Sequence, residues 1–175
     1  MKAVVIYYSK TGFTEKYAKW LAGELDCPCL SLDKGKKTDL SAYDVILYGS
    51  GFRSGTVKNR DWFRKKVLPL GKKNIIFVTG ATAPQSPLIQ KSLKQNFTDA
   101  ELEKIKFFYM HSGLNYEKMG PGDRMMIKAF RHIRKRRAQE KQEGPRAAAL
   151  SGKSFDFSDP SYVEPVLEYI RGITE

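Results

Sequence analysis

Three hydroxyl-bearing residues and a glycine gather in one short stretch near the start of the chain. Ser9, Thr11 and Thr14 lie around Gly12 in the sequence Ser-Lys-Thr-Gly-Phe-Thr, between the apolar run 2–8 and a segment with helical spacing. A helix N-terminus attracts anions because its first N–H groups are unpaired and its macrodipole is positive there. Gly12 has no Cβ, so the chain could turn closely around a phosphate. The stretch predicts an anion-binding loop formed by Ser9, Lys10, Thr11, Gly12, Phe13 and Thr14.

Helix capping is the alternative interpretation of this loop. A threonine before a helix is a common N-cap, and either Thr11 or Thr14 could have that role. Capping explains one hydroxyl and leaves the other two without a function. No Gly-x-x-x-x-Gly-Lys-(Ser/Thr) motif and no Gly-x-Gly-x-x-Gly motif follows a strand-like run, so loops for nucleoside triphosphates or dinucleotides are not indicated.

The elements that would position the loop can be predicted from the pattern of apolar residues. Nearly continuous apolar runs suit strands that are buried on both faces, as in a parallel sheet. The expected strands are 2–8, 30–32, 44–50, 74–79 and 105–111; the expected helices are 15–25, 59–68, 84–96 continued by 99–104, and 160–173. This alternation predicts an α/β fold, a flavodoxin-like doubly wound five-stranded parallel sheet of order 2-1-3-4-5, in a single domain over residues 1–175.

Two further loops follow strands at the edge where such sheets bind ligands, the carboxyl ends of the strands. The first is glycine-rich and contributes Ser50, Gly51, Phe52, Arg53 and Gly55; the second contributes Thr79, Gly80, Ala81 and Thr82. Each loop alone could be an ordinary connection between a strand and a helix. Three such loops at one edge favour a shared ligand.

The first loop carries a family resemblance. Ser-x-Thr-Gly-x-Thr directly after the first strand resembles the FMN-phosphate loop of flavodoxins, which binds the phosphate with hydroxyls and amides. The resemblance implies FMN as the cofactor and a flavin held by all three loops. Phe52 could then cover a face of the ring, and Arg53 could stabilise anionic reduced flavin or bind a substrate carboxylate. Residues 79–82 could reach the pyrimidine edge of the flavin.

Residues 112–158 form a connection that is too long for a compact doubly wound domain, so we expect an insertion with its own task. Residues 124–141 hold eight Lys or Arg and one acidic residue, and so carry seven of the formal net charge of +12. Met126, Ala129, Phe130 and Ile133 lie on one stripe of a predicted helix, for which Asp123 is a candidate N-cap.

A basic amphipathic helix of this kind could lie on an anionic membrane surface. A solvated helix packed on the domain is one alternative, and nucleic-acid binding is a less expected one, since no recognised nucleic-acid motif accompanies the basic run. The candidate residues for contact with a membrane or an anionic partner are Arg124, Lys128, Phe130, Arg131, Arg134, Lys135, Arg136 and Arg137.

The insertion carries a narrower resemblance. Residues 113–130 resemble the segment after the fifth strand of the flavodoxin-like, menaquinone-dependent protoporphyrinogen oxidases of bacteria, with its Tyr-x-Lys-(Leu/Met)-x-x-x-Asp-Arg-(Leu/Met)-Met-Ile pattern. The resemblance implies an FMN-dependent oxidoreductase that dehydrogenates protoporphyrinogen IX or a similar tetrapyrrole precursor and passes electrons to a quinone. No side chain is required as nucleophile or general base; Arg53 and His111 are the candidates for a catalytic role.

Two other functions remain open at this stage. One is a flavodoxin-type electron carrier or an NAD(P)H-dependent quinone or flavin reductase, and the other is a non-enzymatic binding module that uses the basic helix. The expected partners are a porphyrinogen, a quinone and an anionic membrane surface, without nucleic acid; the oligomeric state is not indicated.

The sequence favours a cytoplasmic protein, peripheral on the inner face of the cell membrane if the basic helix binds there. Its apolar runs are shorter than the ~20 residues that span a bilayer, and its N-terminus lacks the pattern of a secretory signal. Cys27 and Cys29 form an isolated Cys-Pro-Cys, so we expect reduced thiols and no metal site.

Overall fold

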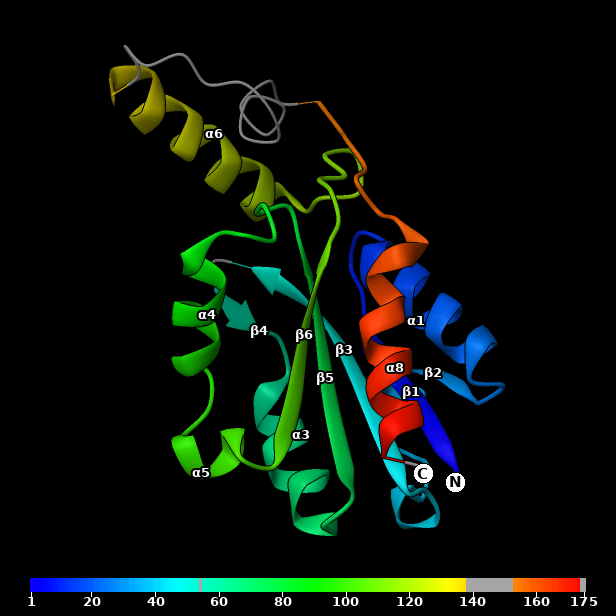
Figure 1. Cartoon of the computed structure of the whole chain (residues 1–175). Coiled ribbons are helices and arrows are strands. Elements are labelled where there is room, and N and C mark those ends of the chain that lie inside the picture. Colours follow the sequence, from blue (N-terminus) through cyan, green and yellow to red (C-terminus); the bar gives the residue numbers. More distant parts are fainter. Residues whose placement is uncertain (54, 138–152, 174–175) are drawn as a thin grey trace.

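Five parallel strands form the central sheet of the protein, as the computed structural model in Figure 1 shows. The structure describes residues 1–53, 55–137 and 153–173, and for Arg53 and residues 130–137 it describes the backbone only. The spatial order is β2-β1-β3-β5-β6, which is the predicted order 2-1-3-4-5 when the parallel strands are counted along the chain. The strands are β1 (Ala3–Tyr8), β2 (Cys29–Ser31), β3 (Val45–Arg53), β5 (Lys73–Gly80) and β6 (Ile105–His111), and the short β4 (Thr56–Val57) pairs antiparallel with the end of β3.

Helices cover both faces of this sheet (Figure 1). One face carries α1 (Phe13–Glu24) and α8 (Glu164–Gly172). The other face carries α3 (Arg60–Lys66) and α4 (Pro87–Lys94), with the short α2 (Leu32–Gly35) and α5 (Asp99–Leu102) beside them. The 3-10 turns are η1 (Leu40–Ala42), η2 (Leu68–Leu70) and η3 (Pro160–Val163). The α/β, flavodoxin-like fold class is therefore confirmed.

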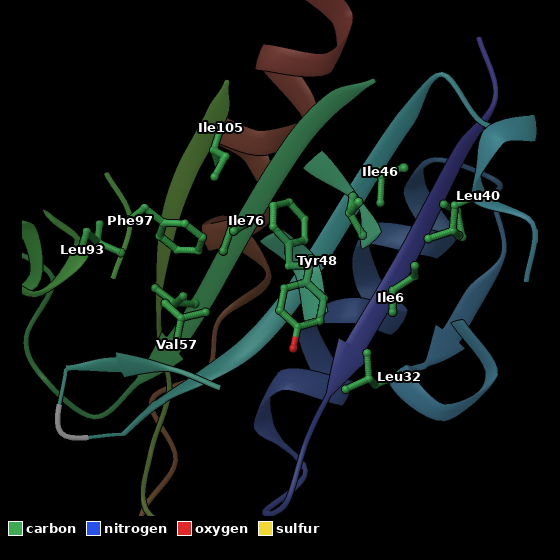
Figure 2. Packing of buried hydrophobic residues seen from close by; sticks show 14 of the residues in the cluster. Ile6, Leu32, Leu40, Ile46, Tyr48, Val57, Ile76, Leu93, Phe97 and Ile105 are labelled. Carbon is green, nitrogen blue, oxygen red and sulfur yellow. The ribbon is translucent and has the colours of Figure 1, made fainter. Parts of the chain in front are cut away.

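The continuous apolar runs are explained by two hydrophobic clusters, one on each side of the sheet. Along β5, Ile76 and Val78 face one cluster, and Ile75 and Phe77 face the other. Figure 2 shows the first cluster, in which Tyr48 and Ile76 pack near Phe97. The second cluster joins α1 and α8 to the sheet through Tyr17, Ala18, Leu21, Val166, Leu167 and Ile170. Packing on both sides fixes the sheet and the edge where its strands end.

Several element boundaries differ from the sequence prediction. The predicted helix 84–96 is α4, which begins at Pro87 because the side chain of Ser86 accepts a hydrogen bond from the Leu88 N–H. The predicted continuation 99–104 is the four-residue α5, which starts a new helix with a capping box between Thr98 and Glu101. The α2 helix and β4 were not predicted, since both are too short to have a periodic pattern.

The insertion rises from the carboxyl edge of the sheet, and its helix α6 (Pro121–Arg137) projects beyond that edge (Figure 1). The prediction of Asp123 as the N-cap is wrong, because α6 begins two residues earlier and Asp123 lies in its first turn. Residues 138–152 of the predicted insertion lie outside the described residues. Among the helices that the structure describes, none has the length and apolar character needed to cross a bilayer.

Candidate functional site

The loop after β1 ends at Gly12, which is the N-cap of α1 and has a left-handed φ of 95°. Glycine is required there because other residues rarely adopt this conformation. Within the described residues no side chain caps α1, so the interpretation of Thr11 or Thr14 as an N-cap is wrong. The Gly12 N–H donates to Ser9 Oγ at 3.1 Å and tightens the loop. The remaining N–H groups of the first turn of α1 have no intrahelical partner and can bind an anion.

Thr14 lies on the inner side of this loop. Its hydroxyl shares a 2.9 Å hydrogen bond with the hydroxyl of Thr79 at the end of β5, and both side chains are buried. Ser50 is also buried, and its hydroxyl accepts the Lys58 N–H at 2.9 Å. These three hydroxyls hold the loops together from inside. Ser9 and Thr11, which are partly exposed, are the hydroxyls that remain on the outer side.

The loop after β3 is shaped by packing against α4 and β6. Gly55 has a φ of 74°, and a Cβ there would lie 2.6 Å from the hydroxyl oxygen of Ser92. The ring of Phe52 is half-buried and meets the ring of Tyr109 edge to face, with 6.4 Å between the centroids. Phe52 is therefore partly used in packing, and its contact with a flavin stays a prediction. Arg53 pairs through its backbone with Thr56, and its side chain lies outside the described residues.

Tyr109 supports the loop after β5, a role that the sequence did not reveal. Its hydroxyl donates to the Thr82 carbonyl at 2.8 Å and lies 2.8 Å from the place that a Cβ on Gly80 would occupy. Burial raises the pKa of Tyr109 well above its ordinary value, so the phenol keeps its proton and remains a donor. Gly80 and Thr82 are thus fixed by a residue of the neighbouring strand, and Ala81 lies between them.

His111 ends β6 at the same edge and is buried beside the insertion. Its ring stacks on Phe157 with 5.1 Å between the centroids and an interplanar angle of 17°. Within the described residues Nε2 has no hydrogen-bond partner, and burial lowers the pKa of the ring despite a hydrogen bond to the backbone of Ala81. Burial therefore disfavours the charged form of His111, and its role as a proton donor stays a prediction.

The insertion is fastened where it leaves and rejoins the domain, and we call residues 112–124 together with 153–159 the insertion root. Leu114 and Phe155 exchange two backbone hydrogen bonds of 2.9 Å. The hydroxyl of Tyr17 donates to the His111 carbonyl and accepts the Asp159 N–H at 3.1 Å. A 2.9 Å ion pair joins Lys16 to Asp156. Since Tyr17 and Lys16 belong to α1, the insertion root is attached to the helix that follows the first loop.

Arg124 is used inside the insertion root. Its Nε donates to the Tyr116 carbonyl at 3.1 Å and its Nη2 donates to the Glu117 carbonyl at 2.7 Å, while the guanidinium lies 5.4 Å from the centre of the Tyr116 ring. Lys128 is exposed on α6. The other expected contact residues with a membrane or an anionic partner are placed in α6 by their backbone alone: Phe130, Arg131, Arg134, Lys135, Arg136 and Arg137.

Comparison with known proteins decides the family. The model of the family described as Flavodoxin domain matches residues 4–141, which is most of the chain. The chain belongs to the flavodoxin domain family. A curated relative of this flavodoxin domain is an uncharacterized protein of Methanocaldococcus jannaschii, 31% identical over 110 residues that cover 62% of this chain and 73% of the relative.

Solved structures with a similar chain trace are more distant from this flavodoxin domain. The Trp repressor binding protein of Bacillus subtilis has 12% identity and a TM-score of 0.47 over 63% of this chain and 84% of its own. A flavodoxin from the domain Archaea has 18% identity and a TM-score of 0.42, with coverages of 62% and 85%. A WrbA-like flavodoxin from Agrobacterium tumefaciens has 17% identity and a TM-score of 0.44, with coverages of 86% and 92%. The family assignment rests on the family match and not on these structures.

FMN is the cofactor of this flavodoxin domain, and the first loop fits its phosphate. A Cβ on Gly12 would have a single neighbour within 4 Å, the amine of Lys118 at 4.0 Å, so the loop is open on that side. The uncapped N-terminus of α1 supplies N–H donors, and Ser9 and Thr11 add hydroxyls. The contacts of individual residues with FMN stay predictions, including those of the twelve other residues named from the sequence: Lys10, Phe13, Thr14, Ser50, Gly51, Phe52, Arg53, Gly55, Thr79, Gly80, Ala81 and Thr82.

The two cysteines lie away from this edge. Cys27 and Cys29 are free thiols next to or on β2, and burial raises the pKa of Cys27 to about 11 and also raises that of Cys29. A thiol with a raised pKa is a poor nucleophile at neutral pH. In the described part of the chain no group of three or more His, Cys, Asp or Glu side chains could hold a metal ion.

Proposed function

We propose that this flavodoxin domain is an FMN-dependent oxidoreductase that dehydrogenates protoporphyrinogen IX, or a similar carboxylate-bearing tetrapyrrole precursor, and delivers the electrons to a quinone. The coarser statement, an FMN-binding protein of the oxidoreductase or electron-carrier type, follows from the family. The observation that supports the finer one is the insertion root, whose Tyr116, Lys118 and Arg124 belong to the pattern shared with the protoporphyrinogen oxidases and which lies at the cofactor edge.

The chemistry is divided between cofactor and protein. FMN supplies two-electron chemistry when bound, so no nucleophile is needed from the chain. The loop at Gly12 would hold the phosphate, and the loops after β3 and β5 are held in place from inside by Ser50, Thr79 and Tyr109. What these residues contribute is a fixed position for the flavin and exclusion of water from the inner side of the loops.

The charge of the protein suits a substrate with carboxylates. The chain has a formal net charge of +12, and α6 carries much of it at the edge where the cofactor loops lie. A basic surface near a binding site raises the local concentration of anionic substrates and their rate of association. Small electron carriers that dock on basic partners would instead need an acidic surface, and this contrast favours the enzyme over the carrier.

The decisive experiment is an anaerobic turnover measurement on the FMN-loaded protein. We expect protoporphyrinogen to bleach the flavin absorption and a menaquinone analogue to restore it, with porphyrin fluorescence growing in proportion. Bleaching by NAD(P)H but not by protoporphyrinogen would overturn the proposal in favour of a quinone or flavin reductase. Reoxidation by a protein electron acceptor but by no quinone would instead indicate an electron carrier.

We further propose that α6 brings the enzyme to an anionic membrane, where a quinone would be available. Met125 is 70% exposed, and Lys128, about one helical turn farther along α6, is exposed too. Helices that bind at membrane interfaces combine apolar and basic residues in this way. We expect the protein to bind vesicles that contain about 30% anionic lipid and not to bind neutral vesicles.

The matched variants for this test replace five cations each. Substitution of Arg131, Arg134, Lys135, Arg136 and Arg137 by Gln is expected to abolish vesicle binding. The control variant removes the same charge from other elements and is expected to preserve most of the vesicle binding. Its substitutions to Gln are at the exposed Lys65, Lys66, Lys73, Lys94 and Lys104. Equal loss in both variants would show that net charge, and not α6, drives the attraction.

A further inference from the structure

Lys118 reaches the cofactor loop from a distant part of the sequence. It lies in the insertion root, yet its amine is 4.0 Å from the position that a Cβ on Gly12 would occupy. Its charge is also felt by Glu15 in the first turn of α1, whose pKa is lowered chiefly by a hydrogen bond with Lys19 and to a smaller extent by Lys118. The open side of the phosphate loop therefore faces a cation that comes from outside the loop, in addition to the loop's own Lys10.

The backbone beside Lys118 is held on both sides. The Lys118 N–H donates to Asn115 Oδ1 at 3.1 Å, and the two carbonyls before it, those of Tyr116 and Glu117, accept hydrogen bonds from Arg124. The Tyr116 N–H donates to Ser154 Oγ at 3.0 Å. The stem of Lys118 thus starts from a turn whose backbone is held in place.

No ion pair of 4.0 Å or less joins Lys118 to an acid among the described residues. Glu15, which feels the charge of Lys118, forms a 2.7 Å ion pair with Lys19 on the next turn of α1. Asp156, in the returning segment of the insertion root, pairs with Lys16 at 2.9 Å, and Asp159 of the same segment accepts the Ser161 N–H. Glu15 and Asp156 are therefore engaged with other lysines, and the amine of Lys118 is available to an external anion.

We propose that Lys118 binds the phosphate of FMN and that the insertion thereby completes the cofactor site. The phosphate monoester carries a charge between −1 and −2 at neutral pH, with a second pKa of about 6. Neutral N–H and hydroxyl donors leave that charge uncompensated, whereas an ammonium group adds a charge-assisted hydrogen bond. Arg124 is then a positioning residue, since it fixes the turn from which Lys118 extends.

The test compares FMN with riboflavin, which has the same ring and no phosphate. Apoprotein is titrated with each flavin and binding is followed by quenching of flavin fluorescence. We expect Lys118→Met to weaken FMN binding about tenfold, as loss of about 1.4 kcal/mol implies, and to leave riboflavin binding unchanged. Lys118→Arg should restore most of the FMN affinity, and the salt dependence of FMN binding should be weaker in Lys118→Met.

The matched control is Lys104→Met, which removes one exposed lysine next to α5, at the opposite end of β6 from the cofactor edge (Figure 1). It should bind FMN like the parent protein. Equal weakening of FMN and riboflavin by Lys118→Met, or no weakening of either, would overturn the inference. Because the titration contains no porphyrinogen or quinone, either result leaves the proposed reaction to its own test.

Discussion

The insertion root and the outer part of α6, residues 125–137, belong to the same basic insertion, but their cations differ in contacts and exposure. In the insertion root, Arg124 binds two backbone carbonyls and Lys118 extends to the phosphate loop. Farther along α6, Lys128 and Met125 are exposed. Cations that look alike in the sequence therefore have different surroundings, and the proposed role at the cofactor concerns only those of the insertion root.

The largest effect is expected from a substitution that separates the two segments of the insertion root, 112–124 and 153–159. A Cβ on Gly113 would lie 1.9 Å from the Phe155 carbonyl oxygen, and neither backbone can move aside without breaking the Leu114–Phe155 pairing. We expect Gly113→Ala to lower the free energy of unfolding by about 3 kcal/mol and to weaken FMN binding. Urea denaturation and flavin titration measure the two effects.

Gly120→Ala is the control for that variant, since a Cβ on Gly120 would meet nothing within 4 Å. Its stability should stay within about 0.5 kcal/mol of the parent protein. If the two variants behave alike, the insertion root is not clamped as described.

Removal of one hydroxyl should have the next largest effect. Tyr17→Phe leaves the buried carbonyl of His111 and the Asp159 N–H without their partner, and we expect a loss of about 2 kcal/mol in the free energy of unfolding. Burial raises the pKa of Tyr17 to about 12, so this contribution is complete below pH 10 and is lost as the pH rises toward 12.

The difference in stability between parent and Tyr17→Phe should therefore shrink between pH 10 and 12. Urea unfolding at pH 8, 10 and 11 measures it, and the other buried tyrosines cancel because both proteins contain them. A difference that grows with pH would contradict the assigned hydrogen bonds.

Arg124→Gln and Lys128→Gln compare the two parts of the insertion directly. Each removes one positive charge, but only Arg124 holds carbonyls of the turn before Lys118. We expect Arg124→Gln to weaken FMN binding about fivefold, equivalent to about 1 kcal/mol, and Lys128→Gln to leave it unchanged. Equal effects from the two variants, in the same fluorescence titration, would mean that overall charge explains the affinity.

The smallest effect is expected at the ion pair between Lys16 and Asp156. Both side chains are more than one third exposed, so their pairing contributes about 0.5 kcal/mol. A double-mutant cycle with Lys16→Met and Asp156→Asn measures this coupling, which 1 M salt should remove. A coupling above about 1.5 kcal/mol would show that the pair is a main fastening of the insertion root.

Much of the fold could be predicted from the sequence because its signals are local. Val45–Tyr48 and Ile75–Val78 are continuous apolar runs. Such runs are typical of strands that are buried on both faces of a parallel sheet. The turn at Gly12 before a helix could be predicted for a similar reason, since Gly12 and the start of α1 are adjacent in the chain. Short elements such as β4 were missed, because two residues cannot show a period.

The parts of the site that were missed depend on contacts between distant residues. The contact of Thr14 with FMN stays a prediction, but the hydrogen bond that joins Thr14 of α1 to Thr79 at the end of β5 could not be read from the sequence. Tyr109 belongs to an apolar run in the sequence. Its hydroxyl can reach the Thr82 carbonyl because β6 lies next to β5. In the sequence, Lys118 is only one residue of a motif. Its position near Gly12 depends on how the insertion folds onto the loop after β1, which the sequence does not indicate.

The chain enters and leaves the insertion at neighbouring points, because Leu114 and Phe155 are paired. A segment closed at its base in this way behaves as an interchangeable module. We expect that the segment beyond Arg124 can be shortened or replaced while the loops at the cofactor edge keep their shape. New substrate or surface preferences could thus be acquired without redesigning the flavin-binding core.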